Sequence, residues 1–365
     1  MTEIENLIKS KKELIKTQQK NTIRIEALEP SYYPTDIILR EESEQITEAI
    51  LTGIMNRIPQ HIIIYGPTGN GKTVTVQYIL NHITRETKTY GTRYLYLNAK
   101  ETETTYKIYQ EILREQKKGQ TTQELKERAT HHLTPTTILV IDEADRLQDL
   151  DIIYHVTRFT KTSLILLTQN SYWYRDLKDQ TVKTTLQARH IIFKPYLPPT
   201  IQEILTKRCQ EAFRHWEAGI ISLLSAKLYT DFQSDIRIGM EALKNIGLTD
   251  QWETNKVYEQ LQEANEKIEQ QVIKNLTNRQ IILLDILRKE PITANAYQTY
   301  QKKSSMPISR ATFLKECKAL TDLGLILLIN TRVKKTQTFQ ALITLHDTET
   351  IGKEATERGL NLFQN

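Results

Sequence analysis

The sequence predicts an α/β fold with a parallel sheet, followed by an all-helical lid and a C-terminal winged helix. Three observations lead to this prediction: a complete phosphate loop at residues 66–73, short apolar runs that alternate with helical patterns up to about residue 198, and purely helical patterns from there to about residue 255. Such alternation is typical of doubly wound parallel sheets. Pro195, Pro198 and Pro199 mark the boundary between the first two parts.

The phosphate loop has the form G-x-x-x-x-G-K-[ST] and lies between an apolar run at 62–65 and a helical pattern that starts at Val74. Glycines let backbone amides close around phosphate oxygens, and the helix that follows directs its positive dipole at the anion. Lys72 is expected on the β- and γ-phosphates, and the Thr73 hydroxyl on Mg²⁺. The predicted contacts of a nucleoside triphosphate are Gly66, Pro67, Thr68, Gly69, Asn70, Gly71, Lys72 and Thr73.

A second part of the predicted site follows the apolar run at 138–141, which is typical of a buried parallel strand. Asp142 and Glu143 come directly after it, where side chains point into the ligand crevice of an open sheet. Asp142 suits coordination of Mg²⁺ with the nucleotide, and Glu143 suits polarisation of the attacking water. The pair predicts hydrolysis as well as binding.

Two further residues are candidates for sensing the γ-phosphate. The apolar run at 163–168 ends in Gln169 and Asn170, and an amide there either touches the γ-phosphate or forms an ordinary turn. Ser234 or Asp235 is expected to cap a helix whose first turn holds Arg237. A cation is unfavourable at that end of a helix, so Arg237 has either an anionic partner or a solvent-exposed, salt-bridged role.

The composition is that of a soluble globular protein, with 39% hydrophobic and 25% charged residues among 365. The apolar runs are too short to span a membrane, and the Lys/Glu-rich N-terminus does not resemble a secretory signal. Cys209 and Cys317 are expected to be buried free thiols, and no zinc spacing occurs. We expect a cytoplasmic, nucleoid-associated protein without a membrane partner and without a metal other than Mg²⁺.

The predicted domains are a charged N-terminal helix or tail at 1–22, a nucleotide-binding core at 23–198, a helical lid at 199–255, and a linker helix with a winged helix at 256–365. Residues 273–335 carry twelve basic and four acidic residues, a net charge of +8, which leaves −3 for the other 302 residues. Local positive charge is typical of nucleic-acid-binding domains.

The C-terminal part reads as three helices and a basic β-hairpin. Helical patterns cover 279–288 and 294–301, Ser309 caps a third helix, and strands at 325–329 and 339–345 flank a connection at 330–337. The third helix would lie in a major groove and the hairpin tip on phosphate or minor groove. A winged helix that contacts protein is the alternative. The candidate DNA contacts are Arg310, Lys315, Lys318, Arg332, Lys334 and Lys335.

Together, these features resemble the archaeal branch of the origin recognition and cell-division-control initiator family of AAA+ ATPases, over about residues 25–345. Within that resemblance, Asn170 matches the sensor asparagine and Arg237 the lid's sensor arginine. The resemblance is carried by several segments. Residues 28–34 and 40–42 resemble the entry segment, Asn98 follows a strand at 94–97, and residues 142–147 resemble the second nucleotide motif. Residues 153–158 resemble the helix after it, and residues 192–196 resemble the strand that leads to the lid.

The resemblance implies a slow ATPase that cycles between ATP and ADP with Mg²⁺ and uses the nucleotide as a switch. It further implies binding to double-stranded DNA at a replication origin, recruitment or loading of the replicative helicase, and contacts with other initiator subunits. The family inserts a DNA-touching element into the core, and residues 116–122 occupy roughly that place. An ordinary surface loop is the alternative for this stretch.

Three positions depart from the family pattern. Thr181 and Gln187 replace an arginine and a glycine of the segment 179–187, and Ser234 replaces a glycine of the lid. Lys183 and Arg189 are the candidates to replace the missing arginine. If that arginine is a finger, its loss would slow hydrolysis by a factor on the order of 10³–10⁵. Two other functions are therefore considered: a winged-helix DNA-binding regulator whose nucleotide exchanges slowly, and an AAA+ targeting ATPase of a mobile element.

Overall fold

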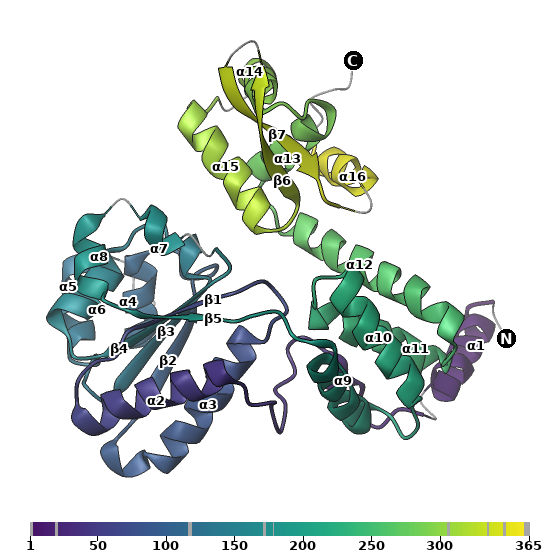
Figure 1. The fold of residues 1–365 in the computed structure, drawn as a ribbon, viewed down its shortest axis with the longest axis horizontal. Helices are drawn as coiled ribbons and strands as arrows, with labels where there is room; N and C mark the ends of the chain where they lie inside the picture. Colours follow the sequence, from purple (N-terminus) through teal and green to yellow (C-terminus); the bar gives the residue numbers. More distant parts are fainter. Residues whose placement is uncertain are drawn as a thin grey trace. The chain divides into compact units, whose positions relative to one another are not determined.

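The computed structural model describes residues 3–18, 21–115, 119–170, 173–177, 179–304, 307–333, 336–345 and 348–360 of the chain. The chain divides into two compact units, Met1–Val257 and Tyr258–Asn365 (Figure 1). The division lies close to the boundary that the sequence predicts between residues 255 and 256.

The first unit is built on a five-stranded, fully parallel sheet with the strand order β2-β3-β4-β1-β5. This confirms the predicted α/β fold. The last strand differs from its prediction: it ends at Ile192, and residues 193–196 follow it without regular secondary structure. The strands are β1 (Ile62–Tyr65), β2 (Arg93–Asn98), β3 (Thr137–Asp142), β4 (Ser163–Thr168) and β5 (Arg189–Ile192).

Alternation along the strands separates two apolar layers, because successive side chains point to opposite faces of a sheet. Ile62 and Val140 pack in a cluster with α2 and α3, whereas Ile63 and Leu139 pack in a cluster with the helices of the other face (Figure 1). Burial on both faces explains the continuous apolar runs in the sequence. The helices are α2 (Glu41–Asn56), α3 (Lys72–Glu86), α4 (Thr105–Leu113), α5 (Thr122–Thr130), α6 (Asp151–Phe159), α7 (Trp173–Asp176) and α8 (Gln180–Leu186).

The lid contains α9 (Pro198–Ala212), α10 (Ala218–Asp231) and α11 (Ile236–Thr249). Pro198 and Pro199 open α9, where a missing amide proton costs no hydrogen bond. The unit begins with α1 (Glu3–Gln18), and the segment that follows it, with a short turn at Ile25–Leu28, is bonded to the lid helices. The Ile23 amide donates to the Ala212 carbonyl at 2.8 Å, and Lys244 forms an ion pair with Glu29.

The second unit contains α12 from Tyr258 onward, a helical cluster and an antiparallel hairpin. The Ser309 hydroxyl accepts a hydrogen bond from the Thr312 amide, as expected for the cap of the third helix. One core joins Leu284, Phe313 and Ile326 of three elements. The elements are α12 (Val257–Lys274), α13 (Asn278–Lys289), α14 (Thr293–Lys303), α15 (Arg310–Asp322), β6 (Ile326–Val333), β7 (Thr336–Ile343) and α16 (Glu349–Glu357).

The hairpin is longer than predicted. Thr331, Arg332 and Val333 were expected in a connecting loop, but they pair with Thr338, Gln337 and Thr336. β-Branched residues favour extended backbone, which accounts for the longer ladder. Arg332 therefore lies on a strand.

Cys209 and Cys317 are free and buried, and burial raises the pKa of each thiol to about 12. In the described part of the chain, no helix has the length and apolar character needed to cross a membrane.

Close packing within the lid gives a first prediction. A Cβ atom on Gly247 of α11 would lie 2.1 Å from the ring of Phe213, which is fully buried. We expect Gly247→Ala to lower the free energy of unfolding by about 1–3 kcal/mol, measured by urea denaturation. Gly219→Ala in α10 is the control, because its Cβ would meet no atom within 4 Å and alanine favours the helix. Equal stability of both variants would contradict the tight packing.

Candidate nucleotide site

The phosphate loop connects β1 to α3, and its three glycines have backbone angles in the region that favours glycine. Gly71, with φ of +73°, caps α3 directly before Lys72. Added Cβ atoms would clash at all three positions: on Gly66 with the Phe193 carbonyl oxygen at 2.7 Å, on Gly69 with the Asp235 carboxylate at 2.0 Å, and on Gly71 with the Tyr196 hydroxyl at 2.3 Å. The loop thus keeps a tight turn whose backbone amides form a cradle for an anion.

Buried polar groups of this loop fit a bound phosphate. The Asn70 side chain is fully buried, and neither its amide nitrogen nor its oxygen has a hydrogen-bond partner. The Lys72 ammonium donates to the carbonyls of Gly66 at 2.6 Å and Pro67 at 2.8 Å. Burial lowers the pKa of Lys72 to about 8. A desolvated cation among amide donors is suited to an anionic ligand.

Thr73 and Asp142 join the two predicted halves of the site. The Thr73 hydroxyl donates to Asp142 Oδ2 at 2.7 Å, and the Glu143 amide donates to Oδ1 at 2.8 Å. The Tyr96 hydroxyl on β2 also donates to Oδ2. Burial and the neighbouring Asp142 carboxylate raise the pKa of Tyr96. A hydroxyl beside a carboxylate is a ligand set that fits Mg²⁺, and Thr73 and Asp142 would hold it.

Glu143 follows the strand in a left-handed backbone conformation, with φ of +52°. Its carboxylate is 3.9 Å from the Arg146 guanidinium and lines the same cavity as the phosphate loop. Left-handed non-glycine residues are uncommon and often occur at active sites. This position suits the predicted role in activating water.

The cavity beside the loop has a volume of about 350 Å³, which lies within the range of small-molecule sites. Phosphate-loop residues, Asp142 and Glu143 line one part of it, together with Arg237 from the lid. The structure thus brings together nearly all of the residues that the sequence predicts for the nucleotide.

Gly66, Pro67 and Asn170 are not among the residues that line the cavity. The neighbour of Asn170, Gln169, does line it, and its Oε1 accepts a hydrogen bond from the Thr68 hydroxyl at 3.0 Å. The backbone N–H of Asn170 donates to the Thr168 hydroxyl at 3.0 Å. In this structure, the polar amide at the strand end that faces the site belongs to Gln169.

Asp235, rather than Ser234, caps α11. Its Oδ1 accepts hydrogen bonds from the amide of Arg237 at 2.9 Å and from Nε of the same residue at 3.0 Å. The Arg237 guanidinium also forms an ion pair with Asp235 at 2.5 Å. Its anionic partner is therefore this carboxylate, which lies so close to the phosphate loop that a Cβ on Gly69 would be 2.0 Å from it.

Two of the departures from the family pattern occur at left-handed positions. Ser234 has φ of +61°, and Gln187 has φ of +33° at the end of α8. Glycine adopts such angles without steric cost, which explains why it is usual at both places. The Ser234 hydroxyl donates to the Tyr196 carbonyl at 2.9 Å. That hydrogen bond offsets part of the strain.

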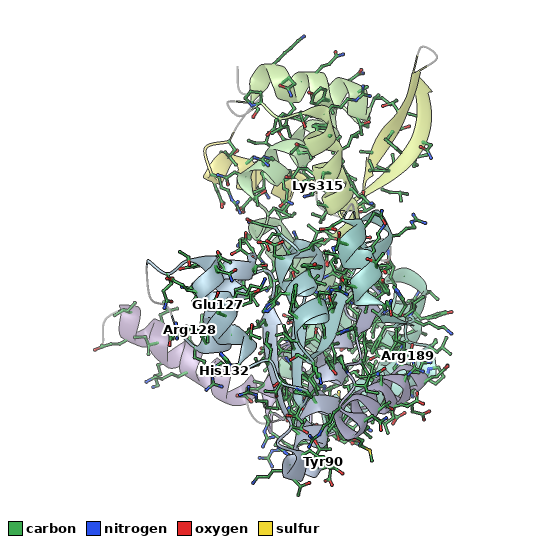
Figure 2. The ribbon with its side chains drawn as sticks, turned by 90° about the vertical axis from the view of Figure 1, so that its left-hand side faces the viewer. Tyr90, Glu127, Arg128, His132, Arg189 and Lys315 are labelled. Carbon is green, nitrogen blue, oxygen red and sulfur yellow. The ribbon has the colours of Figure 1, made fainter. Side chains whose placement is uncertain are left out.

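The two residues expected to replace the missing arginine, Lys183 and Arg189, both contact other parts of the chain. Lys183 donates to the Arg175 carbonyl at 2.6 Å, and Arg189, which is labelled in Figure 2, forms an ion pair with Glu48 at 2.9 Å. The Thr181 amide itself is bonded to the helix cap Asp179 at 2.8 Å.

The predicted DNA contacts lie in the second unit. Arg310, Lys315 and Lys318 are exposed on α15, and Figure 2 labels Lys315. The backbone of Arg332 is part of β6, but its side chain is outside the description. Lys334 and Lys335 lie outside the described residues, as do residues 116–118 of the predicted core insertion.

The phosphate loop and the carboxylate that ends β3 define a P-loop site, and residues 56–173 match the family described as an AAA domain. An ORC1-type DNA replication protein of Methanoregula boonei is 27% identical over 355 residues, which cover 84% of this chain and 82% of the relative. The ORC1-type protein of Pyrococcus abyssi is 27% identical over 348 residues, covering 84% and 83%.

Solved structures of archaeal ORC proteins share the fold of this chain. The Aeropyrum pernix ORC1 protein in complex with DNA aligns with a TM-score of 0.71 at 21% identity, covering 93% of this chain and 98% of that one. The ORC2 protein of the same organism, in ADPNP–ADP complexes, aligns with a TM-score of 0.59 at 17% identity, covering 93% and 100%. The chain is thus similar over most of its length to archaeal ORC1-type replication proteins, and the predicted resemblance and AAA+ fold are confirmed.

The lowered pKa of Lys72 predicts how stability depends on pH. Between the folded pKa of about 8 and the ordinary value of 10.5, the unfolded chain binds more protons at this residue than the folded one. The free energy of unfolding should therefore rise with pH across this window, by about 3 kcal/mol in full. Lys72→Met should lack this part of the rise.

Urea unfolding of both proteins at pH 7.5 and 9.5 measures the difference. All other titrating groups are common to the two chains, so their contributions cancel. Equal increases for wild type and Lys72→Met would contradict a lowered pKa at this position.

Proposed function

We propose that this chain is an ATP-dependent DNA replication initiator that binds double-stranded origin DNA and helps to recruit or load the replicative helicase. ATP and Mg²⁺ occupy the cavity in this proposal, and slow hydrolysis to ADP changes the state of the protein. Thr73 and Asp142 hold Mg²⁺, Lys72 contacts the β- and γ-phosphates, and Glu143 orients the attacking water.

The observation that carries the proposal is the hydrogen bond between Thr73 and Asp142. It places the hydroxyl that ends the phosphate loop beside the carboxylate that ends β3, and this is the arrangement that a P-loop site needs for its metal. The likeness to ORC1-type proteins, which are DNA replication proteins, supports the choice among P-loop functions.

DNA binding is proposed on three grounds. Residues 273–335 are strongly basic, the second unit has the order of helices and hairpin expected of a winged helix, and α15 exposes Arg310, Lys315 and Lys318. In addition, the structure with the TM-score of 0.71 is described as an ORC1 protein in complex with DNA. Together these features favour phosphate contacts by α15 over a protein-binding role.

A Glu143→Gln variant tests the nucleotide part of the proposal. It should bind ATP with nearly wild-type affinity, because glutamine keeps the size of the side chain, but hydrolyse it at least about 100-fold more slowly. Calorimetry and phosphate release measure the two properties. Lys72→Ala is the matched control and should lose binding of both ATP and ADP. Wild-type turnover by Glu143→Gln would remove Glu143 from the reaction.

Replacing Arg310, Lys315 and Lys318 together by glutamine tests the DNA part. Each lost phosphate contact lowers the slope of log affinity against log salt by ~0.9, so we expect a decrease of up to about 3. Fluorescence anisotropy on duplex DNA between 50 and 200 mM salt measures it. Glutamine at Lys9, Lys11 and Lys12, exposed lysines of α1, is the control of equal charge. An unchanged slope in the α15 variant would mean that α15 does not face DNA.

A second candidate is a DNA-binding regulator with nearly permanent nucleotide. Thr181 favours it, because this residue takes the place of an arginine in the family pattern and the nearby cations Lys183 and Arg189 are bonded within the chain. In that case the Glu143→Gln change leaves turnover and exchange unaltered, so the same measurement separates the two functions.

A further inference from the structure

Arg208 on α9 is a buried cation that lines the nucleotide cavity without a hydrogen-bond partner. Its side chain is 9% exposed, and its buried terminal nitrogen Nη1 is unpaired. Among the described residues, its guanidinium forms no hydrogen bond or ion pair, and it makes a cation–π contact with the Tyr32 ring. Burial lowers the pKa of Arg208. A buried guanidinium without a partner is costly, which suggests that a ligand supplies the acceptor.

Tyr32 fixes the position of this guanidinium. The Arg208 side chain lies over the Tyr32 ring, 5.1 Å from its centre, and the Tyr32 hydroxyl donates to Glu211 on the same helix. Arg208 and Glu211 both line the cavity. One aromatic residue therefore holds a donor and an acceptor together in the wall of the site.

The charges around the cavity separate into two groups. Lys72 is influenced by Asp142, Arg237, Asp145 and Asp235, which surround the phosphate loop. Arg208 is influenced by Glu211 and Tyr32 instead. The N-terminal segment and α9 also line the cavity, with the apolar residues Pro30, Pro34, Ile37 and Ile204 and with an ion pair between Lys207 and Asp36 at 2.8 Å. Since this ion pair satisfies both of its charges, Arg208 remains the unpaired donor of a partly apolar wall, which suits a nucleoside better than a phosphate.

We infer that Arg208 donates hydrogen bonds to the nucleoside part of the bound nucleotide and thereby contributes to its affinity independently of the phosphate contacts. This inference rests on the proposed nucleotide binding. The acceptor is a ring nitrogen of the base or an oxygen of the ribose, since a guanidinium has donors only. A ligand acceptor in a dry pocket satisfies a group that the folded chain leaves unpaired.

The test is calorimetry of Mg·ADP binding to the full chain as wild type, Arg208→Met, Arg208→Lys and Arg214→Met. Methionine retains length and contact with the Tyr32 ring but has no donor. Arg214 is exposed and is not among the cavity-lining residues, so its substitution is the matched control. We expect Arg208→Met to weaken ADP binding roughly 10- to 100-fold, as for a hydrogen bond to a charged group, Arg208→Lys to weaken it less, and Arg214→Met to leave it unchanged.

Two further readouts separate this role from a structural one. The melting temperature of Arg208→Met without nucleotide should equal or exceed that of wild type, since a buried unpaired charge is removed, and a marked decrease would indicate a structural role. Affinities for Mg·ATP should fall by the same factor as those for Mg·ADP. With 2′-deoxy-ADP, a smaller loss identifies the ribose as the acceptor, and an equal loss identifies the base or the rest of the sugar.

The outcomes distinguish failure of this inference from failure of the proposed function. If wild type binds ADP and Arg208→Met binds it equally well, the role of Arg208 is overturned and nucleotide binding stands. If Arg208→Met fails to fold, Arg208→Lys decides: an unchanged affinity for Mg·ADP, whether or not the affinity for Mg·ATP falls, overturns the inference. If wild type binds no adenine nucleotide, both proposals fall.

Discussion

The close approach of the phosphate loop to the segment that leads into the lid is the constraint on which the rest of the first unit depends. Side chains are excluded at Gly66 by the Phe193 carbonyl, at Gly71 by the Tyr196 hydroxyl and at Gly69 by Asp235. These three neighbours come from the segment after β5 and from the start of α11. The same glycines that open the loop to phosphate also let the exit segment and the lid pack against it. Phosphate binding and lid position are thus physically linked.

Arg40 strengthens this junction from the other side. Its guanidinium lies over the rings of Phe193 and Tyr196, forms an ion pair with Glu42 at 2.6 Å and donates to the Lys194 carbonyl at 2.8 Å. The hydrogen bond from Ser234 to the Tyr196 carbonyl then joins the exit segment to the lid. The cation–π contacts of a planar guanidinium with two rings restrict the positions of all three side chains, because they are favourable only in a narrow range of geometries. The lid is attached to the core by this short clamp and by the N-terminal segment.

Local sequence patterns predicted the elements of the fold well, because a strand or a cap is encoded by neighbouring residues. β1 and β4 have the predicted bounds, and Ser309 and Asp235 are caps as expected from their types. Contacts made by tertiary packing were not predictable in this way. The Tyr96 hydroxyl reaches Asp142 only because β2 and β3 are adjacent, and the sequence signal was limited to a tyrosine near Asn98. Which of Gln169 and Asn170 faces the cavity likewise depends on the path of the chain after β4. The predicted strands of the hairpin were too short, because polar stretches rich in threonine resemble loops in sequence.

Two of the cations that the lid contributes to the cavity, Arg237 and Arg208, differ in their partners. Arg237 is held by Asp235 beside the phosphate loop, so a phosphate must compete with a carboxylate for it. Arg208 is held by a ring and has no competing acid within hydrogen-bond distance, so an acceptor there meets less resistance. Contact at the first site therefore depends on the charge of the ligand, whereas contact at the second depends on its shape and acceptor atoms. A lid that carries both can respond separately to which nucleotide is bound and to how many phosphates it has. In the proposed function, this separation would let the nucleotide stay bound while the state of the protein changes.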